Sequence, residues 1–229
     1  MEKSKNAFTL AEVLITLCIL GVLAAVLMPI IKDLYPDKNV VMFRKSYYLV
    51  EKIVYELVND ESLYPESEDV TKVGLNNVDA VSYMGKKYGD TESKTSVAAK
   101  SKFCKLFAAK VNVSDTEEIR CEESILPINP LGNYVAPSFT TTDGVAYYIP
   151  YTSTFYNPHE TYGLPPLPTK PQPLYIDVNN SQPPNCIYSS TCPEPDIFSM
   201  DISVDGRVIP ANDKAKEYLK NNTKFRNKK

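Results

Sequence analysis

Apolar residues dominate the first part of the chain. From Val13 to Ile31 no charged side chain occurs over 19 residues, enough for about 28 Å of α-helix at 1.5 Å per residue. A buried helix of a soluble domain would show one polar stripe, whereas this stretch is apolar on every face. The pattern predicts a transmembrane helix over residues 8–31. Between Val13 and Ile31 only Thr16, Gly21 and Pro29 interrupt its apolar character.

Apolar residues then recur at the spacing of an amphipathic helix. They occupy positions Val40, Phe43, Tyr47, Val50, Ile53, Val54, Leu57 and Val58. We expect a helix that runs to about Asp60 and packs its apolar face on a folded domain. It follows the first helix directly, so the two are expected to form one long spine, with an irregularity at Pro36.

Later segments mix helix and strand signals. Residues 61–100 are polar and show no clear period. The expected elements are, in order, a helix over residues 95–110, strands over 144–149 and 174–178, a hairpin around Asp205-Gly206 and a short helix over 213–220. This order predicts an α+β fold, in which the helical spine packs on a C-terminal antiparallel sheet of three to four strands over about residues 144–211.

Length and charge limit the classes of protein that the chain can belong to. Its 229 residues suit one membrane helix and a single further domain. A formal net charge of −3, with no long basic block, argues against a dedicated nucleic-acid binder. No nucleic-acid partner is therefore expected.

One of the five cysteines lies in the N-terminal apolar segment, and the other four lie in the later part of the chain. Cys18 lies in the apolar segment, where a thiol is a small apolar group. The other four suit two disulfides if their part of the chain faces an oxidising compartment. Short loops close most readily, which favours the local pairs Cys104–Cys121 and Cys186–Cys192. The alternative is a zinc site of four thiolates, but neither pair has the close spacing typical of such sites.

The leader MEKSKNA precedes the apolar run. By the positive-inside rule Lys3 and Lys5 favour a cytoplasmic N-terminus, which places the bulk of the chain on the other side. A secretory signal peptide would carry its cleavage site after the apolar run, and no such small-residue motif follows it. The small residue next to a plausible cleavage site is Ala7, before the run.

The stretch Ala7-Phe8-Thr9-Leu10-Ala11-Glu12-Val13-Leu14, followed by Gly21 and Pro29, resembles the start of type IV prepilins and type II secretion pseudopilins. The resemblance implies cleavage between Ala7 and Phe8 by a prepilin peptidase, followed by N-methylation of Phe8. The family usually has glycine before the cleaved bond, and alanine is the mildest replacement. The implied organisation is a cytoplasmic leader over residues 1–7, a membrane and assembly helix over 8–31, and an extracytoplasmic pilin-like domain over 32–229.

Glu12 is the conspicuous exception at the edge of the apolar segment. An unpaired carboxylate there costs about 2–3 kcal/mol or more, so a partner is expected. In a filament the processed N-terminus of a neighbouring subunit supplies a cation that can pair with Glu12 and set the register between helices. The alternative is a membrane anchor in which Glu12 reaches the headgroups. Gly21 and Pro29 are expected to let the helix bend.

Candidate catalytic chemistry is sparse. His159 is the only histidine, no Ser-His-Asp arrangement is suggested by local sequence, and no glycine-rich phosphate loop occurs. The chain is therefore not expected to be an enzyme or to need a cofactor, with calcium the one possible exception.

The calcium candidates lie after the second expected strand. Asp177, Asn179 and Ser181 have the first, third and fifth positions of a calcium loop, and major pseudopilins often bind calcium near the end of the sheet. However, Gln182 replaces the usual glycine and no glutamate follows at position twelve. Asp196 and Asp201 could contribute. The alternative is an Asx-rich turn stabilised by its own hydrogen bonds.

A proline-rich run, GLPPLPTKPQP, occupies residues 163–173. Such a run favours polyproline II, a conformation that some recognition ligands use. The favoured interpretation is a stiff surface loop, and partner binding is the alternative.

Together these features suggest a structural subunit in the bacterial inner membrane. Its N-terminus would be cytoplasmic and its domain periplasmic or extracellular. Its partners would be a prepilin peptidase, further copies of itself and other pilin-like subunits in a filament. The alternative is a single-pass membrane-anchored binding domain that never polymerises.

Overall fold

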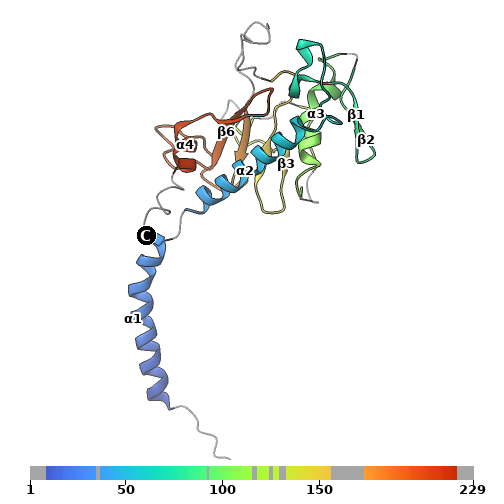
Figure 1. Cartoon of the computed structure of the whole chain (residues 1–229). Helices are drawn as coiled ribbons and strands as arrows, with labels where there is room; N and C mark the ends of the chain where they lie inside the picture. The colour runs from blue at the N-terminus through green and yellow to red at the C-terminus, as the bar shows by residue number, and fades with distance from the viewer. Residues whose placement is uncertain are drawn as a thin grey trace, which may run out of the picture. The chain divides into compact units, whose positions relative to one another are not determined.

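The structure, a computed structural model, describes residues 9–34, 37–91, 93–114, 118–123, 126–128, 133–155 and 173–220. It is an α+β protein with an N-terminal apolar helix and a C-terminal antiparallel sheet (Figure 1), as the sequence predicts at this coarse level. The chain divides into two compact units, Met1–Lys38 and Asn39–Lys229, which are described separately.

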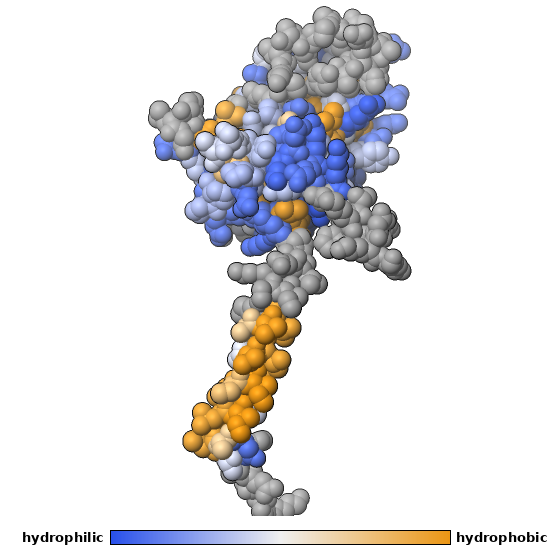
Figure 2. All heavy atoms as spheres, turned by 90° about the vertical axis from the view of Figure 1, so that its left-hand side faces the viewer, coloured by the Kyte–Doolittle hydropathy of each residue, from blue (hydrophilic) through white to orange (hydrophobic). Residues whose placement is uncertain are grey.

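The first unit contains one helix, α1 (Leu10–Leu34). Every side chain from Leu10 to Leu27 is exposed, and hydrophobic residues cover the face of this helix seen in Figure 2. The helix runs through Gly21 and Pro29 without ending at either. A bend at these residues stays a prediction.

The second unit begins with a separate helix, α2 (Lys38–Val58). The expected single spine is therefore wrong in one respect, because Asp37 is not helical and lies between two distinct helices. The sequence holds the reason: the residue before a proline is biased away from helical backbone angles, and Pro36 itself lacks an N–H. Pro36 and the residue before it lie outside the described residues.

The sheet is larger than expected, with five strands instead of three to four. Its strands are β3 (Phe139–Thr140), β4 (Ala146–Tyr148), β5 (Leu174–Asp177), β6 (Ile197–Ile202) and β7 (Val208–Pro210). They pair antiparallel in chain order, β3-β4-β5-β6-β7. The hairpin around Asp205-Gly206 and the strands β4 and β5 were predicted. The two-residue strand β3 was not, because so short a segment has no readable alternation.

The core lies between α2 and the middle of this sheet, which α2 crosses in Figure 1. One row of register-matched residues crosses four strands: Phe139, Tyr147, Ile176 and Phe198. The ring of Phe43 in α2 stacks on Phe198 with centroids 4.1 Å apart. The Tyr47 hydroxyl donates to the carbonyl of Val208 over 3.1 Å, which ties α2 to the edge strand β7.

Two further helices complete the core. Helix α3 (Val97–Ala108) is capped by Ser96, whose hydroxyl accepts the N–H of Ala99 at 3.1 Å. Its Phe107 packs against the sheet, 5.9 Å from the Tyr147 ring. Helix α4 (Asp213–Lys220) follows β7. Both helices were predicted.

The polar stretch after α2 holds structure that its sequence did not predict. It contains two short 3₁₀ helices, η1 (Val70–Lys72) and η2 (Gly74–Asn76), and a hairpin of β1 (Val81–Tyr83) and β2 (Lys86–Tyr88). Lys102 of α3, only 2% exposed, organises this region by donating to the carbonyls of Asn77 and Asp79 over 2.8 and 2.9 Å. Burial lowers the pKa of Lys102 to about 8, an effect that the charge of Asp79 opposes.

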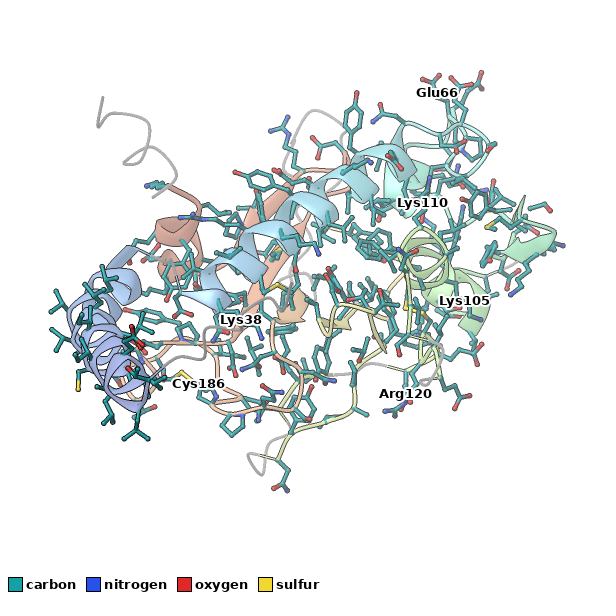
Figure 3. The ribbon with its side chains drawn as sticks, turned by 90° about the horizontal axis from the view of Figure 1, so that it is seen from below. Lys38, Glu66, Lys105, Lys110, Arg120 and Cys186 are labelled. Atoms are coloured by element: carbon teal, nitrogen blue, oxygen red, sulfur yellow. A yellow bond between two sulfur atoms is a disulfide. The ribbon has the colours of Figure 1, made fainter. Side chains whose placement is uncertain are left out.

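Both local disulfides predicted from the sequence are present. Cys104 in α3 pairs with Cys121, and Cys186 (labelled in Figure 3) pairs with Cys192. An ion pair of 2.6 Å between Lys105, also labelled there, and Glu122 reinforces the first link. Cys18, on α1, is a free and exposed thiol.

Two glycines at the same backbone angle provide a matched test of this packing. Gly144 and Gly206 both have φ of +85°, but a Cβ at Gly144 would meet nothing within 4 Å. A Cβ at Gly206 would meet the Val58 side chain of α2 at 3.1 Å. We predict that Gly144→Ala costs about 1–2 kcal/mol of unfolding free energy, the usual penalty for a left-handed residue, and that Gly206→Ala costs more. Denaturant unfolding in detergent measures both. Equal losses would show that α2 does not restrain the β6–β7 turn.

Candidate functional site

The first candidate site is the start of α1. Thr9 and Glu12 form reciprocal hydrogen bonds: the Thr9 N–H donates to Glu12 Oε2 over 2.9 Å, and the Glu12 N–H donates to Thr9 Oγ1 over 3.3 Å. The Thr9 hydroxyl also donates to the same carboxylate oxygen over 2.8 Å. This is a capping box, in which a Thr-x-x-Glu sequence satisfies two N–H groups at a helix start.

The capping box gives Glu12 a local role that the sequence analysis missed, although the Thr-x-x-Glu spacing was its signal. The carboxylate is positioned within its own chain before any partner arrives. Its oxygens remain exposed and can accept further donors. Ala7 and Phe8, the residues of the expected cleavage site, lie outside the described residues.

Helix α1 supplies the physical setting of this carboxylate. Among the described residues it is the one helix long and apolar enough to span a membrane, over Leu10–Leu27. Exposing so many apolar side chains to water is unfavourable by about 25 cal/mol for each Å². The helix is therefore consistent with membrane anchoring, and Glu12 lies near its N-terminal end.

The second candidate site is the loop between β5 and β6. It begins at Asp177 and ends at Asp196, and both carboxylates are fully buried. Asp196 is well satisfied, because its two oxygens accept the N–H groups of Asn185 and Cys186, each over 2.8 Å. It therefore holds the middle of the loop in place beside the Cys186–Cys192 disulfide.

Asp177 is poorly satisfied by comparison. Its Oδ1 accepts the N–H of Asn179 over 3.2 Å, but its Oδ2 has no hydrogen-bond partner in the described part of the chain. Burial raises the pKa of Asp177 to about 7, and the neighbouring charge of Asp196 adds to this. The Asn179 and Asn180 N–H groups and the Tyr134 hydroxyl, which itself donates to Asn180 Oδ1 over 2.9 Å, act in the opposite direction but do not offset burial. The carboxyl group is thus held near its titration point at neutral pH.

The same loop has two more buried oxygens without a donor among the described residues. These are Asn179 Oδ1 and Asn185 Oδ1, whose amide nitrogens donate to the carbonyls of Pro183 and Ser181 over 3.3 and 3.0 Å. Buried polar atoms are normally satisfied by protein groups, ordered water or an ion, so these three oxygens within residues 177–185 have capacity for such a partner. Carboxylate and amide oxygens are the ligands that calcium prefers, so this set fits the ion.

The expected calcium ligands differ in whether their side-chain oxygens are satisfied by hydrogen bonds. Asp177 and Asn179 belong to the unsatisfied set, and Asn185, which the sequence spacing did not reveal, joins them. Asp196 organises the loop backbone. Asp201 lies within β6, five residues and about 17 Å of strand beyond Asp196.

Other candidate chemistry is limited. Within the described residues no group of three His, Cys, Asp or Glu side chains is placed to hold a metal, so a cation in this loop would need amide and backbone oxygens in addition to the Asp177 carboxylate. The four outer cysteines are paired in disulfides, which excludes the zinc site of four thiolates. His159 lies outside the described residues.

Comparison of the chain with models of protein families, with curated proteins and with solved structures finds no match.

The raised pKa of Asp177 makes a prediction about stability. Its folded pKa of about 7 exceeds the usual 3.8, so between these values the folded state binds more protons than the unfolded state. Stability contributed by this group is therefore present below about pH 4 and is lost as pH rises towards 7.

In the presence of a chelator, we expect Tm to fall from pH 5 to 7.5, and to fall less in Asp177→Asn. Glu194→Gln, at an exposed position in the same loop, is the control. Parallel pH profiles for wild type and Asp177→Asn would contradict this account.

Proposed function

We propose that the chain is a structural subunit of a type IV pilus-like or type II secretion pseudopilus filament. The leader would be removed between Ala7 and Phe8 by a prepilin peptidase, and Phe8 would be N-methylated. The protein would then be held in the bacterial inner membrane by α1, with its N-terminus on the cytoplasmic side and residues from 32 onward on the other.

The observation that carries this proposal is α1 itself. It is apolar on all sides, exposed from Leu10 to Leu27, and carries in that stretch one charged residue, Glu12, within its first turn. Such a surface can be buried by lipid before assembly, and by the α1 helices of other subunits after assembly. Two disulfides in the second unit suit an oxidising compartment outside the cytoplasm.

Glu12 would act as the register-setting residue. The capping box fixes the carboxylate at the start of the helix, with exposed oxygens that can accept a cation. Cleavage before Phe8 would create a new amino group on each subunit. Pairing that ammonium with Glu12 of a neighbour, in a filament core without water, would strongly favour one axial register.

A second candidate function is a membrane-anchored binding domain that does not polymerise. The capping box favours this second candidate, because it gives Glu12 a structural role at the helix start that needs no neighbouring subunit. The two candidates can be separated because glutamine also serves in a capping box, but without charge.

We predict that Glu12→Gln and Glu12→Ala are both inserted into the membrane and cleaved, and that both are incorporated into filaments at least tenfold less than wild type. Glutamine retains the cap while removing the charge, so it isolates the pairing with a neighbouring N-terminus. Quantitative immunoblotting of sheared filaments and membranes measures incorporation. Normal incorporation of Glu12→Gln alongside a defect in Glu12→Ala would show that the cap, and not the charge, is what matters.

We further propose that the β5–β6 loop binds calcium through Asp177, Asn179 and Asn185. The ion would supply the positive charge that these unsatisfied oxygens lack and would hold Asp177 ionised. Its role would be to stabilise the loop.

At pH 7.5 we expect calcium at a hundred times its Kd to stabilise the wild-type protein by about 2.7 kcal/mol, seen as a rise in Tm. Magnesium at the same concentration should do less, because it demands a stricter geometry. Asp177→Asn should lose most of the calcium effect, whereas Glu194→Gln should keep it. A calcium response that survives in Asp177→Asn would place the ion elsewhere.

A further inference from the structure

An open groove runs along the β7 edge of the sheet. It has a volume of about 630 Å³ and is lined by one face of α2 and by the strand and turn opposite. The α2 residues are Tyr48, Glu51, Lys52 and Tyr55, and the opposite wall is formed by residues 206–209. Because β7 is the last strand of the sheet, this groove has no neighbouring strand to cover it.

Two tyrosines dominate the helix side of the groove. Tyr48 is 50% exposed and Tyr55 is 66% exposed, on a helix whose opposite face is fully packed. They are seven residues apart, so they lie on the same face at a separation of about 10.5 Å along the axis. The Tyr48 ring is braced by an edge contact with Tyr47, at 5.6 Å between centroids.

Paired exposed aromatics beside a groove are the usual recognition surface for polyproline II segments. The sequence of the chain contains a run whose composition favours this conformation. In residues 163–173 prolines recur every third position, at Pro165, Pro168 and Pro171. A polyproline II helix has three residues per turn and a rise of about 3.1 Å each, so prolines at this spacing would share one face of such a helix at intervals of about 9.3 Å. This interval is close to the separation of the two tyrosines.

The groove and the proline-rich run also carry opposite charges at matching positions. Glu51 lies between the two tyrosines, and Lys170 lies between Pro168 and Pro171. The cations of the groove already have acidic partners: Lys52 pairs with Glu56 at 3.8 Å, and Arg207 pairs with Asp205 at 2.9 Å. Glu51 lies 2.9 Å from the Tyr47 hydroxyl, whose single proton it shares with the carbonyl of Val208, and among the described residues Glu51 has no ion pair.

We propose that the groove between Tyr48 and Tyr55 binds the proline-rich segment, residues 163–173, of a second copy of this chain. The prolines would stack on the tyrosine rings, and Lys170 would pair with Glu51. Tyrosine hydroxyls can donate to the free carbonyls of a polyproline II backbone.

The chain's own segment is too short a tether to fill its own groove in this register. Pro173 adjoins Leu174 in β5, and β5 lies two strand spacings, or about 10 Å, from β7. Pro171 is two residues from Pro173, and a fully extended chain spans at most about 7 Å over that distance. A contact between the groove of one copy and the segment of the next joins two different surfaces, which builds open helical assemblies or rings. This contact needs only two copies of the chain, so it goes beyond the proposed filament. The contact can be disproved while the filament proposal stands.

Photo-cross-linking of the full-length protein in membranes tests this contact. Tyr48 is replaced by p-benzoylphenylalanine in one tagged copy, which is co-expressed with a second copy carrying a different tag. We expect a cross-linked product that contains both tags and whose joined peptide from the second copy lies within residues 163–173. Replacing Pro165, Pro168 and Pro171 of the second copy by alanine should reduce this product at least tenfold.

Two controls keep the result interpretable. The same photo-reactive residue at Tyr188, which is 45% exposed in the β5–β6 loop, should not cross-link to residues 163–173. Tm of the Tyr48 and triple-proline variants should match wild type. A cross-link within one chain, to another segment of the second copy or to a different protein would overturn the proposal, and so would the absence of any cross-link in folded variants.

Discussion

The contact between α2 and the middle of the sheet is the interaction on which the second unit depends. Phe43 stacks on Phe198 of β6, and the Tyr47 hydroxyl binds the carbonyl of Val208 in β7. Truncating a buried phenylalanine typically costs about 3–5 kcal/mol, a large share of the stability of a domain. The same contact sets the orientation of α2 about its own axis. With one face buried against the sheet, the opposite face must point outward, and it carries Tyr48 and Tyr55 beside the free edge of β7.

The β5–β6 loop carries a different constraint, since it is held by polar groups instead of an apolar core. Asp196 and the Cys186–Cys192 disulfide fix its backbone, and at its start Asp177 is buried with one oxygen that accepts no hydrogen bond from the described residues. A buried carboxylate that is neither neutralised nor paired destabilises the folded state. Its retention makes physical sense where a cation or a proton completes the site.

The sequence predicted elements whose pattern is local and long enough to read. The helices α2, α3 and α4, the β6–β7 hairpin and the local disulfides all follow from spacing, turn residues or short loops. The hairpin of β1 and β2 did not, because strands of three residues are too short to show a readable alternation. The break between α1 and α2 had a signal in Pro36 that was interpreted as a local irregularity. In the candidate sites, Asp177 and Asn179 were found by spacing, whereas Asn185 could be recognised only from its unsatisfied oxygen.

Entry of this chain into a prepilin pathway would change the mass of its N-terminal peptide. The protein is purified from membranes of matched cells with and without a prepilin peptidase, and its N-terminal peptide is identified by mass spectrometry. We expect a peptide that begins with N-methylated Phe8 only when the peptidase is present. A chain that begins with the sequence MEKSKNA in both cells would contradict this expectation, and would leave α1 as the anchor of a domain that does not polymerise.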